Sequence, residues 1–220
     1  MESGGVAFLI SLLVTPFWIR FLQARSLGQH IQEDGPHTHH HKAGTPTMGG
    51  VIIVVAAVLG YAMGHVGTAV VVTRSGLLCV AVIIASGLLG FADDFIAIRN
   101  ARNLGLSPRE KLIGQLVIAA AFAVAALYWV HTSTDLSFTR YSLPGWNLTA
   151  LGWFVLAALV IVATSNAVNL TDGLDGLAIL PTVLIAAALG VFCYASGHAD
   201  FARYLAIPAL PAAGEITIVW

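Results

Sequence analysis

Long apolar runs separated by shorter polar connections dominate this chain. The runs lie at about residues 5–22, 48–64, 75–92, 112–130, 149–168 and 177–195. Each is near the length of about 20 residues with which a helix crosses a bilayer. Because no water reaches the backbone in lipid, each segment must satisfy its own N–H and C=O groups, which favours helices over open strands. The pattern predicts an all-α bundle of six transmembrane helices, forming one integral-membrane domain over residues 1–220.

The composition agrees with this class. Hydrophobic residues make up 58% of the chain, charged residues make up 10%, and the mean hydropathy is +0.86, so membrane lipid is the expected surrounding. The formal net charge is −1, and the few basic residues form no stripe that could follow a phosphate backbone, which argues against nucleic-acid binding. Cys79 and Cys193 fall inside apolar runs, where buried thiols are favoured over a disulfide.

Basic residues indicate how the helices are oriented. If the connections alternate sides, one side holds Arg20, Arg25, Lys42, Arg99, Arg102, Arg109 and Lys111, and the other holds Arg74, Arg140 and Arg203. Positive residues stay in the cytoplasm, so we expect the N-terminus outside and the connections 23–47, 93–111 and 166–176 inside. The first run lacks a basic leader and a small-residue cleavage site, so it is expected to remain as a span.

The C-terminal stretch is apolar again but short. Counted from Ala212, it would rise only about 13 Å as a helix, against a hydrocarbon core of about 30 Å. The sequence therefore predicts an incomplete seventh span and a chain that is the front part of a longer protein. We expect the 220-residue chain alone to be inactive.

The first polar constellation precedes the second apolar run. Gly44, Thr45, Pro46 and Thr47 offer amides and hydroxyls that suit phosphate oxygens at a helix entry, and Lys42 adds a point charge. The alternative is a capped turn that only starts the helix. A neighbouring His run, 37–41, is read as a solvated loop, because a metal site needs fixed geometry and supporting contacts.

Two further constellations carry carboxylates at the ends of apolar runs. Asp93 and Asp94 are adjacent and repel each other unless a cation such as Mg²⁺, which prefers oxygen ligands, intervenes. Asn166, Asn169, Asp172 and Asp175 recur every three residues, which keeps successive members near one helical face. Each set has a simpler explanation, a capped helix end for the first and a polar hairpin for the second. The predicted topology nevertheless places both sets on the cytoplasmic side, where they could form one active site.

Four motifs occur together in a fixed order: KAGTPTMGG at 42–50, ADD at 92–94, KLIGQ at 111–115 and NAVNLTDGLDGLA at 166–178. At these positions the chain resembles the phospho-N-acetylmuramoyl-pentapeptide transferases, the MraY-type members of the polyprenyl-phosphate N-acetylhexosamine-1-phosphate transferase superfamily. The resemblance implies a bacterial inner-membrane enzyme that moves phospho-MurNAc-pentapeptide from UDP-MurNAc-pentapeptide to undecaprenyl phosphate, yielding lipid I and UMP. It also implies a requirement for Mg²⁺ and leaves a homodimer open.

The resemblance also implies roles for individual residues. The catalytic residues would be Asp93, Asp94 and Asp175, with Asp94 and Asp175 as Mg²⁺ ligands and Asp93 as the base that deprotonates the lipid phosphate. The substrate-binding residues would be Lys42, Thr45, Lys111, Asn166, Asn169 and Asp172. Whether an Asp instead forms a covalent intermediate stays open, because a carboxylate can serve as base or nucleophile.

The chain departs from the family pattern in two places. The family usually follows its paired acids with two residues and a Lys, but here that position is Ala97, and Arg99 is the nearest cation. A shifted guanidinium is not equivalent to an ammonium. The family's later metal-binding Asp and its His-rich motif would fall beyond Trp220.

Other functions are open to the same residues. A related polyprenyl-phosphate GlcNAc-1-phosphate transferase would keep the paired acids, although KAGTPTMGG argues against it. A transporter would place its acids or broken helices near the membrane midplane rather than at helix ends. A non-catalytic fragment that only folds or assembles is the third alternative.

Overall fold

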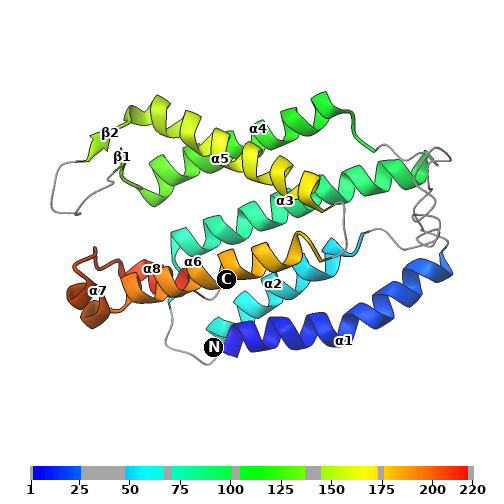
Figure 1. Cartoon of the computed structure of the whole chain (residues 1–220), viewed down its shortest axis with the longest axis horizontal. Helices are drawn as coiled ribbons and strands as arrows, with labels where there is room; N and C mark the ends of the chain where they lie inside the picture. Colours follow the sequence, from blue (N-terminus) through cyan, green and yellow to red (C-terminus); the bar gives the residue numbers. More distant parts are fainter. Residues whose placement is uncertain are drawn as a thin grey trace.

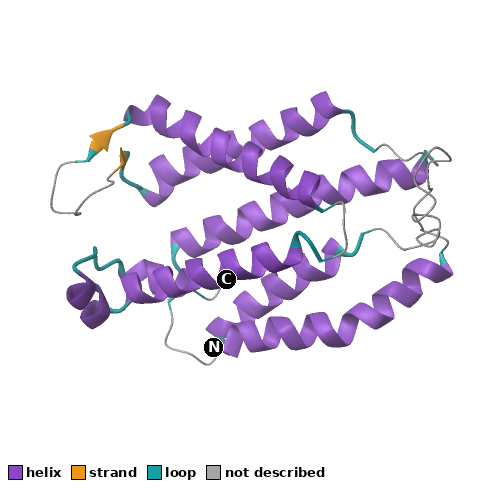
Figure 2. Cartoon of the chain, viewed as in Figure 1, coloured by secondary structure: helices purple, strands orange, loops and turns teal. Residues whose placement is uncertain are grey.

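The computed structural model describes residues 2–25, 48–66, 71–100, 105–136, 145–172 and 176–217, and these residues are mainly helical. The long helices are α1 (Glu2–Ala24), α2 (Gly50–His65), α3 (Arg74–Arg99), α4 (Pro108–Ala125), α5 (Thr149–Thr171) and α6 (Ile179–Gly197). They run roughly alongside one another, so that α1 packs on α2, α2 on α3, α3 on α4 and α4 on α5 (Figures 1 and 2). The predicted helix bundle is confirmed.

Helices occupy the places of all six predicted apolar runs, but only part of the predicted count is confirmed. Within the described residues, five segments are long and apolar enough to cross a membrane: Gly4–Ala24, Arg74–Arg99, Pro108–Val130, Thr149–Thr171 and Ile179–Gly197. Helix α2 has 16 residues, which gives a rise of about 24 Å. The protein is thus a multi-pass membrane protein with five clear spans, and six full spans plus a partial seventh are not established.

Several smaller elements were not predicted. Helix α4 continues into a π-helical turn, η2 (Ala126–Val130), which ends at the left-handed His131, with φ of 62°. Strands β1 (Asp135–Leu136) and β2 (Trp146–Asn147) pair antiparallel. Helices α7 (Ala199–Leu205) and α8 (Pro211–Ile216) follow the last predicted full span, and α8 overlaps the stretch counted as an incomplete seventh span. The remaining residues of the predicted seventh span, 218–220, lie outside the described residues.

Small residues make up about half of the buried apolar positions, whereas most large apolar side chains on the helices are exposed. Ala119 and Ala123 on α4 and Ala126 on η2 are buried, and Leu151 and Leu180 are exposed. This arrangement is typical of membrane helices, because lipid solvates large apolar groups and only small residues allow close backbone approach. The bundle is therefore held together by close packing along its alanine-rich and glycine-rich faces.

Polar contacts fix the ends of individual helices. Helix α4 begins with a capping box in which the Ser107 side chain accepts from the Glu110 N–H and the Glu110 side chain accepts from the Ser107 N–H. Pro108 occupies the first turn of the helix, where no N–H is needed. This capping box sets the start of the helix that carries Lys111 and Gln115.

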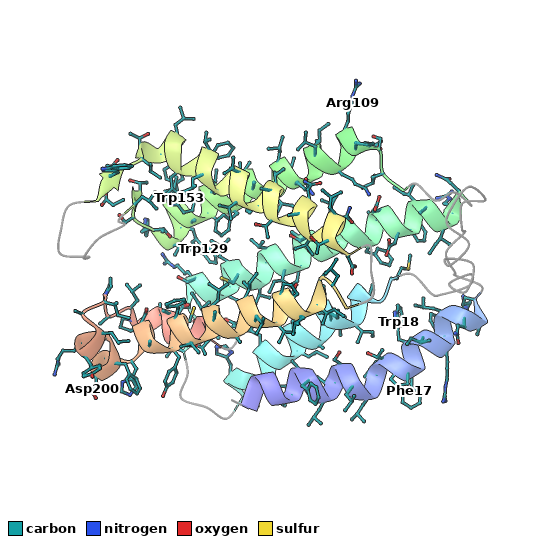
Figure 3. The ribbon with its side chains drawn as sticks, in the orientation of Figure 1. Phe17, Trp18, Arg109, Trp129, Trp153 and Asp200 are labelled. Atoms are coloured by element: carbon teal, nitrogen blue, oxygen red, sulfur yellow. The ribbon has the colours of Figure 1, made fainter. Side chains whose placement is uncertain are left out.

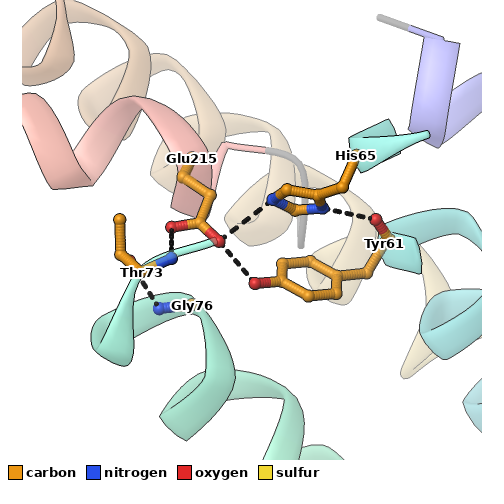
Figure 4. A network of polar contacts seen from close by, with 5 residues as sticks. All are labelled: Tyr61, His65, Thr73, Gly76 and Glu215. Carbon is orange, nitrogen blue, oxygen red and sulfur yellow. Dashed lines mark hydrogen bonds and ion pairs between the residues drawn. The ribbon is translucent and has the colours of Figure 1, made fainter. Parts of the chain in front are cut away.

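A buried carboxylate, Glu215, joins α8 to α2 and α3 (Figure 4). It is 4% exposed and receives a hydrogen bond from the Tyr61 hydroxyl. The His65 Nε2 atom lies 3.1 Å from Oε1, and the Thr73 N–H donates to Oε2 at 2.7 Å. Gly76 is needed beside it, because a Cβ there would lie 2.5 Å from the Glu215 Oε1 atom. We call these five residues the Glu215 network.

Candidate functional site

The candidate site begins at Asp93, near the end of α3. Its Oδ2 atom lies 2.8 Å from the Lys111 Nζ atom on the first turn of α4, and its Oδ1 atom accepts from the Leu106 N–H at 2.7 Å. The Lys111 and Asp93 side chains are 36% and 26% exposed. An ion pair this exposed contributes little to stability, about 0–1 kcal/mol, but it leaves a cation and a carboxylate within reach of a ligand.

The connection before α4 wraps closely around Asp93. A Cβ on Gly105 would lie 2.1 Å from the Asp93 backbone oxygen and 2.4 Å from its Oδ1 atom. No side chain fits there, so glycine is required for the Leu106 N–H to reach the carboxylate. The local sequence thus positions Asp93 through Gly105 as well as through Lys111.

Asp94 turns in another direction, toward the start of α2. Its Oδ2 atom accepts from the Met48 N–H at 3.1 Å. Met48 is buried and adopts a left-handed φ of 70°, and its carbonyl accepts from the Trp18 indole N–H at 3.1 Å. Trp18 is labelled on α1 in Figure 3. Asp94 therefore holds the backbone immediately after residues 42–47, which are outside the described part of the chain.

A polar cluster within the membrane helices connects α4 to α5. The Gln115 Nε2 group donates to the Ser165 Oγ atom at 3.0 Å, and the Asn166 Nδ2 group donates to the Gln115 Oε1 atom at 2.8 Å. Asn166 also donates to the Val162 carbonyl at 2.8 Å. Gln115 lies one helical turn beyond Lys111, so both side chains lie on the same face of α4.

A cavity of about 600 Å³ brings the two groups of polar side chains together. Asp93, Lys111, Gln115, Asn166 and Asn169 are among its polar lining residues, and Val82, Leu89, Ile118, Val160 and Ile161 are among its apolar ones. The volume is in the range of small-molecule sites, about 300–1,000 Å³. Such a cavity can hold a ligand that carries both a charged group and an apolar part.

The cavity contains four of the residues that the sequence suggested, namely Asp93, Lys111, Asn166 and Asn169. Asp94 and Asp172 do not line it, and Asp172 is exposed at the end of α5. Lys42, Thr45 and Asp175 lie outside the described residues. Arg99, the expected substitute for a Lys at position 97, is exposed and is not a lining residue. The functional roles of all these residues stay predictions.

Sequence reasoning missed Gln115 and Ser165. Gln115 is one of two buried polar or charged side chains among the described residues, the other being Glu215. A Gln four residues after Lys111, inside an apolar run, was the available signal, because an unpaired amide in lipid is costly. Its partners, about 50 residues away on α5, could not be read from the local sequence.

Comparisons with known proteins agree with these motifs. Residues 74–215 match the family described as glycosyl transferase family 4, and residues 42–54 match the phospho-N-acetylmuramoyl-pentapeptide-transferase signature 1. A phospho-N-acetylmuramoyl-pentapeptide-transferase from Frankia alni is 44% identical over 200 residues, which cover 87% of this chain and 55% of that protein. The chain thus spans about half the length of this relative. The chain belongs to glycosyl transferase family 4 and, within it, to the phospho-N-acetylmuramoyl-pentapeptide-transferase type.

Proposed function

We propose that this protein transfers phospho-MurNAc-pentapeptide from UDP-MurNAc-pentapeptide to undecaprenyl phosphate, forming lipid I and UMP in peptidoglycan synthesis. The observation that carries the proposal is the cavity in which the Asp93–Lys111 pair lies beside an apolar lining within the membrane helices. A polyprenyl phosphate has this combination of an anionic head and an apolar tail. The Frankia alni relative, a phospho-N-acetylmuramoyl-pentapeptide-transferase, supports the same reaction.

The chemistry suits phosphoryl transfer, in which catalysis consists mostly of positioning and charge neutralisation. Lys111 would neutralise a phosphate at the cavity, while Asp93, held by the Leu106 N–H, would accept the proton of the lipid phosphate. A lipid phosphate oxygen would then bond to the sugar-linked phosphorus, and the bond from that phosphorus to UMP would break. Lys42 and Thr45 would bind the diphosphate, a role consistent with Asp94 anchoring the adjacent Met48.

The oxygen donors at the site fit Mg²⁺ in part. This ion is usually held by one or two carboxylates together with substrate phosphates. Asp94 uses Oδ2 for Met48, and among the described residues no hydrogen bond to its Oδ1 atom is found. The described residues contain no cluster of three His, Cys, Asp or Glu side chains. Asp94 and Asp175 would therefore hold Mg²⁺ together with the substrate, and the ion would offset negative charge on the diphosphate.

The positions of the carboxylates and the matched signature favour this function over its alternatives. Asp93 and Asp94 lie close to one end of α3, whereas a transporter would place such acids near the midplane. The match at residues 42–54 favours a MurNAc-pentapeptide substrate over GlcNAc. We also propose the bacterial inner membrane as the location, with the N-terminus outside and this cavity facing the cytoplasm.

The direct test measures UMP release from UDP-MurNAc-pentapeptide with undecaprenyl phosphate and Mg²⁺, using the chain extended to the full length of its relatives. Lys111→Ala should lower kcat/KM by at least about 100-fold, because a charge-assisted contact to the moving phosphoryl group is lost. Arg109→Ala is the matched control, since Arg109 is exposed on the same helix and points away from the bundle (Figure 3). An unsubstituted protein that releases no UMP, or a Lys111→Ala variant with full activity, would contradict the proposal.

A further inference from the structure

The hydrogen bonds between α4 and α5 have a fixed direction. The Val162 carbonyl can only accept, so the amide that donates to it, Asn166 Nδ2, must be an NH₂ group. The second hydrogen of that NH₂ group points to Gln115, which must therefore present its carbonyl oxygen there. The Gln115 NH₂ group is then directed at the Ser165 oxygen. One backbone carbonyl thus sets the orientation of two side-chain amides.

This direction of the hydrogen bonds determines which atom of Asn166 can bind a ligand. Both hydrogens of the Asn166 NH₂ group are used, and no partner of its Oδ1 atom is found within the described part of the chain. Asn166 lines the cavity, as do Gln115 and Lys111. The Asn166 carbonyl oxygen is therefore an acceptor that a ligand in the cavity can use.

We propose that Gln115 is a positioning residue, which holds the Asn166 amide so that its carbonyl oxygen accepts a hydrogen bond from a hydroxyl or N–H group of the nucleotide-sugar substrate. This inference rests on the proposed function. Gln115 itself is suited to the task because it is buried and both ends of its amide are bonded, so its own rotation would break two hydrogen bonds. Without Gln115, rotation of Asn166 would cost only the single bond to Val162.

The test compares Gln115→Met with Asn166→Ala in the full-length protein, by measuring kcat and KM for UDP-MurNAc-pentapeptide. Gln115→Met keeps most of the volume but removes both hydrogen bonds, and it should raise KM about tenfold, the effect of one lost hydrogen bond. The KM for undecaprenyl phosphate should change less than about threefold. The control is Val117→Met, which introduces the same side chain at an exposed position of α4.

A double variant separates positioning from a general effect on the fold. If Gln115 acts through Asn166, Gln115→Met should not raise KM further when Asn166→Ala is already present, whereas independent effects would multiply. Multiplied effects, or an unchanged KM in Gln115→Met, would overturn the inference. An unsubstituted protein that releases no UMP would instead overturn the proposed function and this inference with it.

Gln115→Leu provides a second variant if Gln115→Met does not fold. Leu also removes both hydrogen bonds without adding a charge to the cavity, so it should raise KM for the nucleotide-sugar about tenfold, the effect of one lost hydrogen bond. An unchanged KM in a folded Gln115→Leu variant would overturn the inference.

Discussion

Substituting Glu215 by Ala should destabilise the bundle far more than removing any exposed acid. The carboxylate accepts from the Tyr61 hydroxyl and the Thr73 N–H and contacts the His65 ring, and Glu215 is almost fully buried. Each buried group left without its partner costs about 1–3 kcal/mol. Water or detergent reaching the end of the bundle would reduce this cost, so we expect a total near the lower end, about 3–5 kcal/mol. For a chain of this size, each kcal/mol shifts Tm by about 2–4 °C.

The assay is thermal unfolding in detergent, followed by circular dichroism, with Glu215→Ala expected to lower Tm by about 6–20 °C. Asp200→Ala is the control, because Asp200 is an exposed acid on α7 (Figure 3) and its loss should shift Tm by less than about 2 °C. Tyr61→Phe removes one donor and should give an intermediate shift. A Glu215→Ala variant that unfolds within 2 °C of the unsubstituted protein would refute the reasoning.

Further predictions concern the site and the topology. Gly105→Ala should reduce UMP release at least about tenfold, because its Cβ would collide with Asp93. Gly5→Ala, with open space at its Cβ on α1 and away from the cavity, should have little effect, and equal activity in both variants would contradict the role of Gly105. Asp94→Asn keeps an acceptor for the Met48 N–H, so it should raise the Mg²⁺ concentration needed for half-maximal UMP release without lowering Tm. Asp94→Ala should raise that concentration and also lower Tm. An unchanged Mg²⁺ requirement in Asp94→Asn would contradict the metal role. Single Cys probes at positions 40 and 101 should be labelled only from the cytoplasm and a probe at 138 only from outside, and labelling of position 101 from outside would reverse the proposed orientation.

The helices were predictable from the sequence because each is a local feature. The apolar runs extend over most of each helix, so hydropathy alone located α1, α3, α4, α5 and α6. Hydropathy located the ends of the helices less accurately than their centres. Helix α2 begins at Gly50 rather than at residue 48 because Met48 takes a left-handed conformation. That conformation accompanies contacts with Trp18 and Asp94, 30 and 46 residues away along the chain.

The site was predictable in its residue types but not in its pairings. Spacing indicated that Asn166 and Asn169 share a helical face, and the cavity contains both. The different partners of Asp93 and Asp94 could not be predicted. Adjacent side chains on a helix point in different directions, and the partners, Lys111 and Met48, come from two separate parts of the chain. Glu215 lies in the short C-terminal stretch counted from Ala212 and was not singled out there, since its partners are 142 and more residues away along the chain.

The Glu215 network also has a consequence for the order of events during synthesis. Tyr61, His65 and Thr73 are made about 140–155 residues before Glu215, which is a delay of roughly 7–31 s at about 5–20 residues per second. During this interval α2 and α3 can enter the membrane, but their polar groups lack the acceptor that later joins them. We expect that end of the bundle to close only after Glu215 has left the ribosome. A Cys introduced at position 65 should therefore react with a water-soluble maleimide in chains arrested before residue 215, and equal protection before and after that point would contradict this order.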